Sequence, residues 1–265
     1  MRRARPIAVR EPRGPRGPAP MILGIIPARG GSQRLPRKAL AVCAGRTLLA
    51  WAIESALASK ALTGVWVTTD DGAILESAQA YAVTVIRRPP HLAMDSTPDL
   101  PVFQHVLGAI EDHQPPLGFD DLFVHLRPTN PLRTGSDIDA AVDYFRARWA
   151  SSLRSVVRAR QHPGKMYDQG GMRTEPWAGF TELRPLIPPM HEPNGPSQWL
   201  PPVWRACGFV DIVRAPFVRM GSMEGPSVAA WPIADRVAVD IDTAEDVAEV
   251  ERRMGAGTDR RGGGL

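Results

Sequence analysis

Residues 22–40 have the sequence ILGIIPARGGSQRLPRKAL, in which an apolar run passes directly into a loop with two glycines, three arginines and a lysine. The run Ile22–Pro27 is rich in branched aliphatic residues, which favours a buried strand. The loop that follows contains no carboxylate to balance its cations. We therefore expect a first strand whose carboxyl end opens onto a binding site for an anion.

The sequence after this strand alternates between short apolar runs and helical patterns. Further strands are predicted at Val65–Thr69, Val83–Ile86, Leu122–Leu126 and Ser155–Val157, and helices at about Leu48–Ser59, Asp71–Tyr81, Pro98–Glu111 and Ser136–Arg148. This alternation predicts an α/β fold, with a Rossmann-like, doubly wound, mostly parallel sheet and helices on both faces. Ligands of such sheets bind at the carboxyl ends of the strands.

The second half of the chain is less regular. Residues 160–202 are rich in proline and lack a clear period, which predicts an arm inserted into the domain. A strand over Trp204–Val213 and the segment VAVDIDTAEDVAEVERRM, residues 237–254, are expected to return to the main sheet. Residues 1–20, rich in arginine and proline, and residues 255–265 are predicted to be disordered tails around a domain of residues 21–254.

Charge and composition limit the function classes. The first 20 residues contribute +5 to a total formal charge of +4, so the remainder is nearly neutral. A nucleic-acid-binding domain would carry a basic face, and a bilayer span needs about 20 apolar residues, so neither partner is expected. The two cysteines and the absence of an export signal predict a cytoplasmic protein. The six histidines show no metal-ligand spacing, and most are expected at surface or strand-end positions.

The opening loop carries the chemistry of a phosphate site. Gly30 and Gly31 are expected to adopt positive φ and expose backbone N–H groups. The cationic donors of the loop are Arg29, Arg34, Arg37 and Lys38. The loop matches neither the Walker motif nor G-x-G-x-x-G, which disfavours a P-loop kinase and a nicotinamide dehydrogenase. A basic surface loop after a strand is the alternative for this stretch taken alone.

Five stretches, in order, resemble the cytidylyltransferases that activate ulosonic acids. IIPARGGS is similar to the opening loop of the acylneuraminate (CMP-sialate) synthetases, and SQRLPRK to that of the Kdo cytidylyltransferases. Four further stretches resemble the sialate branch: VTTDDGAILESAQAYAVTVI, RRPPHLAMDSTP, LRPTNPLRTGSDI and VDIDTAEDV. The resemblance covers most of Met21–Met254 and implies a nucleotidyltransferase of the CMP-ulosonic acid synthetase type.

The family chemistry implies a role for each match. The anomeric hydroxyl of a 2-keto sugar acid would attack the α-phosphate of CTP, releasing pyrophosphate and forming a CMP-sugar. The catalytic residues implied by the resemblance are Arg29, Lys38, Asp240 and Asp242. The residues expected to bind the nucleotide are Arg29, Gly30, Gly31, Ser32, Arg34, Lys38, Arg88 and Thr97. The alternative to nucleotide binding by Arg88 is that it is an exposed arginine at the end of a strand.

The stretch VDIDTAED implies a magnesium site. Asp240 and Asp242 stand at i and i+2 of an extended segment, so both carboxylates point to one side, as a hard cation that bridges phosphate oxygens requires. The alternative is that Asp242 or Thr243 caps the following helix, with Glu245 and Asp246 in its first turn. The two functions are compatible.

The implied acceptor site departs from the family pattern. The expected substrate residues are Arg127, Thr129, Gln198 and Arg205, and Arg127 stands where the sialate enzymes commonly have a glutamine. Ser197 and Cys207 replace an arginine and an asparagine, and Gln33 and Ala39 depart from a lysine and an asparagine in the opening loop. These changes put N-acetylneuraminate itself in doubt. As a hypothesis, Arg127 holds the acceptor carboxylate in a bidentate fork.

The expected partners are therefore CTP, a small sugar-acid acceptor and a second copy of the chain. The arm at residues 160–202 corresponds to the segment through which the family dimerises, and an ordinary surface insertion is its alternative. Two other functions stay open. One is a cytidylyltransferase for a different acceptor, such as a Kdo-like acid or a small phosphonate, and the other is a nucleotide-binding homologue without catalysis.

Overall fold

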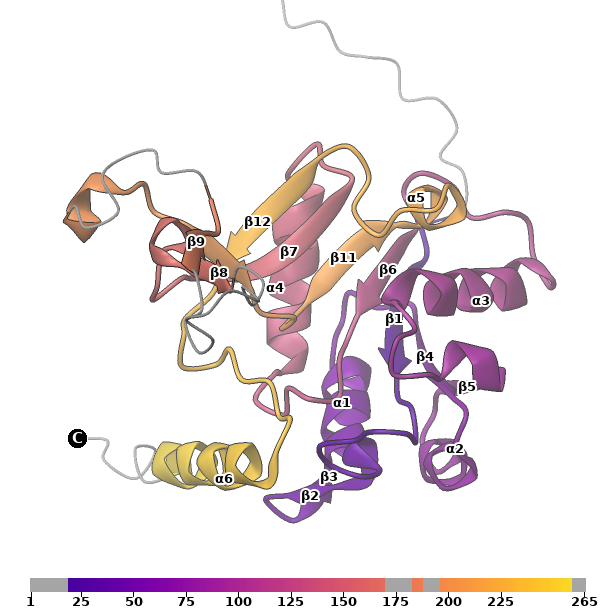
Figure 1. Cartoon of the computed structure of the whole chain (residues 1–265). Helices are drawn as coiled ribbons and strands as arrows, with labels where there is room; N and C mark the ends of the chain where they lie inside the picture. Colours follow the sequence, from indigo (N-terminus) through magenta and orange to yellow (C-terminus); the bar gives the residue numbers. More distant parts are fainter. Residues whose placement is uncertain (1–18, 170–182, 188–195, 259–265) are drawn as a thin grey trace, which may run out of the picture.

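The structure is a computed structural model that describes residues 19–169, 183–187 and 196–258. At its centre is an eight-stranded sheet of order β10-β7-β11-β6-β1-β4-β5, in which β12 also pairs with β7 (Figure 1). The strands are β1 (Ile22–Pro27), β4 (Gly64–Thr69), β5 (Thr84–Arg87), β6 (Leu122–His125), β7 (Ser152–Arg158), β10 (Trp204–Ala206), β11 (Asp211–Arg214) and β12 (Val228–Pro232). All neighbours are parallel except those of β10 and β11. The predicted doubly wound, mostly parallel α/β fold is confirmed.

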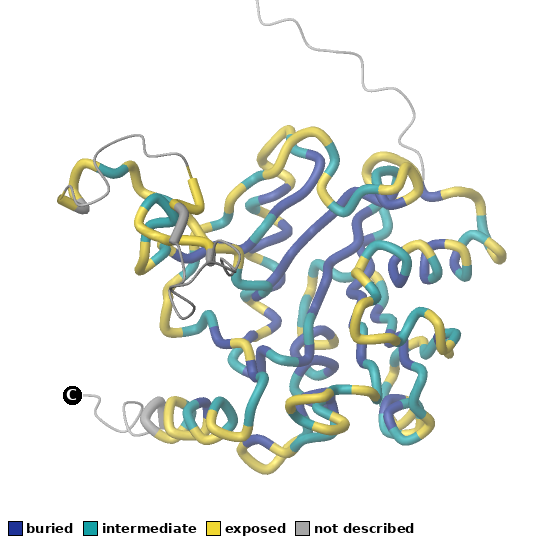
Figure 2. The backbone as a smooth tube through the Cα atoms, in the orientation of Figure 1, coloured by how far each residue is buried: buried dark blue, intermediate teal, exposed yellow. Residues whose placement is uncertain are grey.

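Helices cover both faces of the sheet. Ile22 and Ile26 of β1 face a core built with α1 (Leu48–Leu57), α2 (Gly72–Gln79) and α4 (Gly135–Arg146). Leu23 and Ile25 face the opposite core, built with α3 (Asp99–Glu111) and α5 (Ala215–Arg219). Successive side chains of a strand alternate between faces, so a strand covered on both sides needs a continuous apolar run. The central strands are accordingly buried along their length (Figure 2).

The order of the strands reverses between β1 and β6. From β1 the chain moves outward to β4 and β5, and then crosses to the other side of β1 to form β6. Ile25 of β1 pairs with His125 at the end of β6, so Pro27 and His125 lie close together at the carboxyl edge of the sheet. In open α/β sheets ligands bind in the crevice at such a reversal.

The returning segments differ from the prediction. Trp204–Val213 is not one strand, because Gly208 adopts a φ of 65° and divides it into β10 and β11. Residues 237–243 form no strand of the sheet, and the strand that returns is β12, which the sequence analysis missed. Among the described strands β12 pairs with β7 alone, and its side chains are half-buried at best, so its apolar signal is weak.

The C-terminal helix and the arm complete the described chain. α6 (Ala244–Thr258) packs against the hairpin β2 (Val42–Cys43) and β3 (Arg46–Thr47), and its last turn includes residues 255–258, which were predicted to be part of a tail. The arm contains the antiparallel pair β8 (Tyr167–Gln169) and β9 (Leu183–Pro185).

The remaining predicted tail and arm residues, 1–18, 170–182, 188–195 and 259–265, lie outside the described ranges. Four 3-10 helices are described: η1 (Lys38–Leu40), η2 (Pro90–Leu92), η3 (Pro163–Lys165) and η4 (Ser197–Trp199). No helix within the described ranges combines the length and hydropathy needed to cross a bilayer.

Candidate active site

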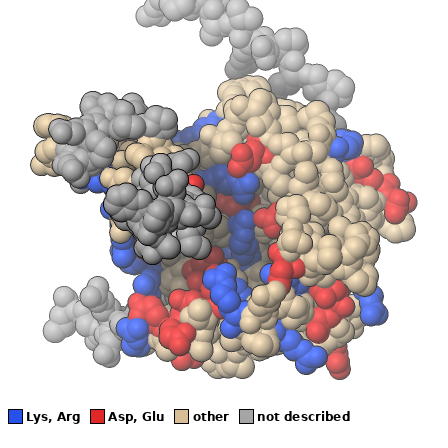
Figure 3. Space-filling model, viewed as in Figure 1, with Lys and Arg blue, Asp and Glu red and all other residues tan. Residues whose placement is uncertain are grey.

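A cavity of about 330 Å³ opens at the carboxyl ends of β1 and β6. This face of the molecule is hollowed, with basic side chains inside the hollow and acidic side chains beside them (Figure 3). The cavity brings together most of the residues predicted for the nucleotide, the metal and the acceptor: Arg29, Ser32, Lys38, Arg88, Thr97, Arg127, Thr129, Asp240 and Asp242. The volume is at the lower end of the usual range for small-molecule sites.

The cationic loop and the late aspartates face each other across this cavity. Lys38, in η1, forms an ion pair with Asp242, although the two residues are 204 positions apart. The guanidinium of Arg34 lies 2.9 Å from the other carboxylate oxygen of Asp242. Asp240 is exposed and forms no ion pair within the described part of the chain. Two cations therefore hold one of the two predicted metal ligands.

Backbone hydrogen bonds fix the acidic segment beside β6. The N–H of Ile241 donates to the carbonyl of Thr129 at 3.0 Å, and the Ile241 side chain is fully buried. The Asp246 carboxylate accepts from the N–H groups of Asp242 and Thr243 at 2.9 and 2.8 Å, and hydrogen bonding with these groups lowers its pKa. Thr243 and Asp246 thus cap α6, which leaves the carboxylate of Asp242 at the cavity.

The two aspartates at the cavity suit a magnesium ion. Within the described residues there is no cluster of three histidine, cysteine or acidic side chains, so a site made by protein ligands alone is not present there. Magnesium is usually held by one or two carboxylates, with substrate phosphates and water completing its octahedron. Asp240 and Asp242 line the same cavity as the cationic loop, and this arrangement fits such a shared ion.

The glycines of the loop do not act as predicted. Neither Gly30 nor Gly31 has positive φ, and the left-handed residue of the loop is Arg37, with φ 48°. A Cβ added to Gly30 would lie 2.7 Å from the Cβ of Asp71, and the Gly30 N–H donates to Asp70 at 3.1 Å. Gly30 is therefore needed for the close approach of the loop to the end of β4, and its N–H is taken by the Asp70 carboxylate, which does not line the cavity.

Two arginines build the wall of the cavity next to the loop. Arg29 donates to the carbonyl of Met94 at 2.9 Å and forms an ion pair with Asp95 at 2.7 Å. Arg88 is buried, against the alternative of an exposed arginine, and donates to the carbonyl of Thr68 at 2.7 Å. Burial lowers the pKa of Arg88. Each guanidinium is thus already engaged by protein groups, and contact with a nucleotide stays a prediction for both.

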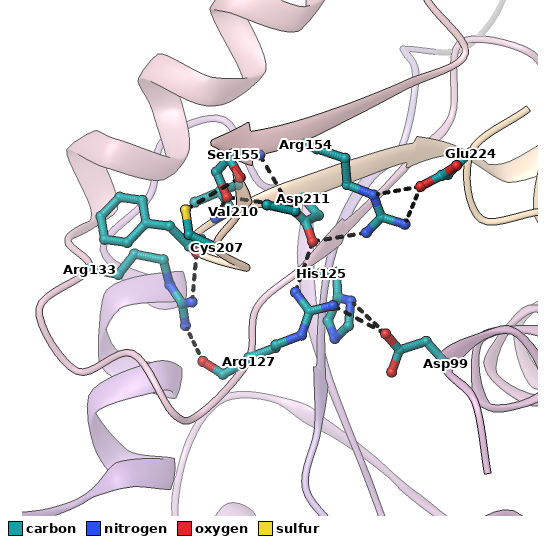
Figure 4. A network of polar contacts seen from close by, with 12 residues as sticks. Asp99, His125, Arg127, Arg133, Arg154, Ser155, Cys207, Val210, Asp211 and Glu224 are labelled. Carbon is teal, nitrogen blue, oxygen red and sulfur yellow. Dashed lines mark hydrogen bonds and ion pairs between the residues drawn. The ribbon is translucent and has the colours of Figure 1, made fainter. Parts of the chain in front are cut away.

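Arg127 lies between two carboxylates at the β6 end of the cavity (Figure 4). Its two terminal nitrogens donate to Asp211 at 2.8 Å and to Asp99 at 3.1 Å. Asp211 is buried and also accepts from Arg154 at 2.9 Å. Burial acts to lower the pKa of Arg127, but Asp211 and Asp99 outweigh this effect and the pKa is raised. The fork predicted for an acceptor carboxylate is therefore occupied by protein carboxylates in this structure.

Residues that the sequence analysis did not select also line the cavity. Those with titratable side chains are Asp95, Asp99 and His125, and Asp211 contacts Arg127 next to them. Their positions in the sequence could have identified them, because Asp99 begins α3 and His125 ends β6. His125 does stand at a strand end, as expected for most histidines, but it is only 1% exposed.

Two predicted acceptor residues lie outside the main cavity. Arg205, in β10, lines a different cavity of about 670 Å³ together with Trp204 and Arg253. Gln198, in η4, is exposed and is not among the residues that line the main cavity. Their part in acceptor binding stays a prediction that this single chain does not support.

Comparisons with known proteins identify the family of this chain. Residues 23–169 match the family model described as cytidylyltransferase. The chain is 26% identical over 234 residues to N-acylneuraminate cytidylyltransferase A of Danio rerio, covering 88% of this chain and 50% of that protein. It is 34% identical over 124 residues to the N-acylneuraminate cytidylyltransferase of Escherichia coli O18:K1:H7 (strain RS218 / NMEC), covering 47% of this chain and 28% of that protein. The chain thus spans about half the length of curated relatives that it matches along most of its own length.

Solved structures share the fold. A CMP:2-keto-3-deoxy-manno-octonic acid synthetase, complexed with CTP, superposes with a TM-score of 0.63 at 17% identity, covering 89% of this chain and 99% of that chain. A 4-diphosphocytidyl-2C-methyl-D-erythritol synthase from Anaerococcus prevotii superposes with a TM-score of 0.56 at 12% identity, covering 89% and 99% of the two chains. Because the family model extends over more than half of the residues and includes the cationic loop, this chain belongs to the cytidylyltransferase family.

Proposed function

We propose that this protein transfers CMP from CTP to the anomeric hydroxyl of a 2-keto sugar acid and releases pyrophosphate. The observation that carries the proposal is the ion pairing of both Lys38 and Arg34 with Asp242, at the cavity that Lys38 and Asp242 line. A cationic loop opposite a pair of carboxylates suits a triphosphate that shares a divalent ion with the protein. The curated relatives are named as N-acylneuraminate cytidylyltransferases, which supports CTP and a sialic acid-like acceptor.

In this proposal the chain acts by positioning and by stabilising charge. Lys38, Arg34 and Arg29 leave their carboxylate partners and balance the phosphate oxygens, while Ser32 donates a hydrogen bond. Asp240 and Asp242 hold Mg²⁺, which when bound polarises the α-phosphate and favours the departure of pyrophosphate. The acceptor hydroxyl lies in line with the leaving group, so most of the rate gain comes from orientation.

The proposed acceptor is a sialic acid-like nonulosonate. Its carboxylate binds Arg127 after displacing Asp99, the more exposed of the two carboxylates on that guanidinium. Because protein carboxylates already bind both terminal nitrogens of Arg127, a second candidate function stays open. It is a cytidylyltransferase for a Kdo-like acid or a small phosphonate. Loss of catalysis is the less favoured alternative, because Lys38, Asp240 and Asp242 all line the cavity.

Pyrophosphate release from the purified chain tests the proposal. With CTP, Mg²⁺ and a panel of ulosonic acids and small phosphonates, we expect turnover with at least one nonulosonate and none without an acceptor. Asp242→Asn is the matched control, since it keeps the shape of the side chain but removes the charge that would hold the metal. Turnover with a phosphonate or a Kdo-like acid alone would select the second candidate. CTP binding without turnover on any acid would contradict the proposed reaction.

A further inference from the structure

His125 is a buried polar residue without a partner at the edge of the cavity. It is 1% exposed, and neither of its ring nitrogens has a hydrogen-bond partner among the residues that the structure describes. The residue ends β6, beside β1, where the order of strands in the sheet reverses. A buried nitrogen left without a partner costs free energy, so a side chain kept in this state calls for a ligand group that completes it.

The groups around the imidazole hold the ring in place without forming hydrogen bonds to its nitrogens. Phe103 packs edge-on against the imidazole with the ring centroids 4.8 Å apart. Asp99 approaches from the mouth of the cavity, but its carboxylate oxygen is 3.7 Å from Nδ1, too far for a hydrogen bond. Packing therefore holds the ring, and the described residues leave its two nitrogens without hydrogen bonds.

The charge state of the ring defines what it can bind. Burial lowers the pKa of His125 well below its ordinary value, and the cations Arg127, Arg154 and Arg133 act in the same direction. A neutral imidazole has one donor and one acceptor nitrogen, so it suits a hydroxyl group, which can both accept and donate. It does not suit an anion, for which the arginines nearby are the better partners.

We propose that His125 is a specificity-determining residue that hydrogen-bonds a hydroxyl group of the bound sugar acid. The inference rests on the proposed function, because it assumes a polyhydroxylated acid in the cavity. The acceptor is favoured over the ribose of CTP because Arg127 is the cation two residues from His125, and an acid that binds Arg127 brings its adjacent hydroxyls to the imidazole.

The test compares His125→Phe with the wild-type chain in the pyrophosphate-release assay. Phenylalanine keeps a planar ring and removes both nitrogens. We expect kcat/KM for the acceptor to fall about 10- to 100-fold, as expected for losing one or two hydrogen bonds and leaving a substrate hydroxyl unpaired, with the KM of CTP unchanged. We also expect the midpoint of thermal unfolding to stay the same or rise, because the substitution removes two unsatisfied buried groups. A purely structural role would lower it.

His105→Phe is the matched control. His105 lies on α3 and has a buried, unpartnered Nδ1, but it does not line the cavity, so its kinetic constants should not change. With acceptor analogues that each lack one hydroxyl, the deficit of His125→Phe should vanish for the analogue that lacks the contacted group.

Three outcomes would overturn the inference. If the wild-type chain is active and His125→Phe keeps its acceptor kcat/KM within twofold, the inference alone is wrong. A rise in the KM of CTP without an acceptor effect would assign the imidazole to the ribose and also contradict it. If the wild-type chain turns over no sugar acid, the proposed function and this inference fail together.

Discussion

At the residue scale, Lys38 gives the clearest kinetic prediction. It forms an ion pair with Asp242 and is expected to transfer to the triphosphate. Lys38→Met should lower kcat at saturating CTP by about 100- to 1000-fold, the usual effect of removing one preorganised donor at a reacting oxyanion. Steady-state pyrophosphate release measures it, with Lys60→Met on the exposed surface as the control. A loss smaller than threefold would exclude Lys38 from the reaction.

The buried His125 also predicts how stability depends on pH. Its folded-state pKa lies well below the ordinary value of about 6.5, so the unfolded chain binds an extra proton below that pH and the folded chain does not. Stability is therefore lost as the pH falls below about 6.5. His125→Phe removes this loss, and its gain in unfolding free energy over the wild type should grow by up to about 1.4 kcal/mol per pH unit between pH 6 and 5. Denaturant titrations at pH 8, 6 and 5 measure the difference, and an equal difference at all three values would contradict it.

At the scale of elements, the sequence predicts the strands and helices that have a regular hydrophobic pattern. It does not predict strands whose existence depends on pairing with a distant strand. The apolar run of β1 was predicted with its correct bounds, because a strand buried on both faces carries a continuous signal. The division of Trp204–Val213 depends on the single residue Gly208, and β12 depends on pairing with β7. At the site, the meeting of the loop with Asp242 followed from family resemblance, whereas the carboxylates on Arg127 come from α3 and β11 and required the fold.

The residue that caps α6 also contacts the backbone of the proposed metal ligand. Asp246 accepts the N–H groups of Asp242 and Thr243, so it both starts the helix and orients the proposed metal ligand. Asp246→Ala should lower the free energy of unfolding by about 1 kcal/mol, typical of a lost cap, and should also weaken Mg²⁺-dependent turnover. Urea denaturation and Mg²⁺ titration of activity measure the two effects. Glu249→Ala, on the same helix but outside its first turn, is the control. A stability loss with an unchanged Mg²⁺ dependence would leave the cap with a structural role only.

At the scale of the whole molecule, the arm predicts a homodimer. Large apolar side chains are exposed on or beside it: Met166, Tyr167, Leu186, Ile187, Trp199 and Trp204. Patches of this kind on a folded chain are typical of protein interfaces. Sedimentation equilibrium should give twice the chain mass of 28.9 kDa, and the double substitution Leu186→Glu/Trp204→Glu should give the monomer. Exposed Trp149 precedes β7, at the end of that strand opposite to the arm, and offers the control Trp149→Glu. A monomeric wild type would contradict the prediction.

The site joins the two ends of the described chain, and this gives a prediction for global stability. Lys38 and Asp242 lie 204 positions apart, so a ligand that bridges them can bind only the folded molecule. At 100 times its Kd, such a ligand adds about 2.7 kcal/mol to the free energy of unfolding. We expect CTP with Mg²⁺ to raise the unfolding temperature clearly, and CTP with EDTA to raise it less. In Asp242→Asn the two conditions should give the same smaller shift, because the metal would lose a ligand. An equal shift with Mg²⁺ and with EDTA in the wild-type chain would remove the two aspartates from the metal site.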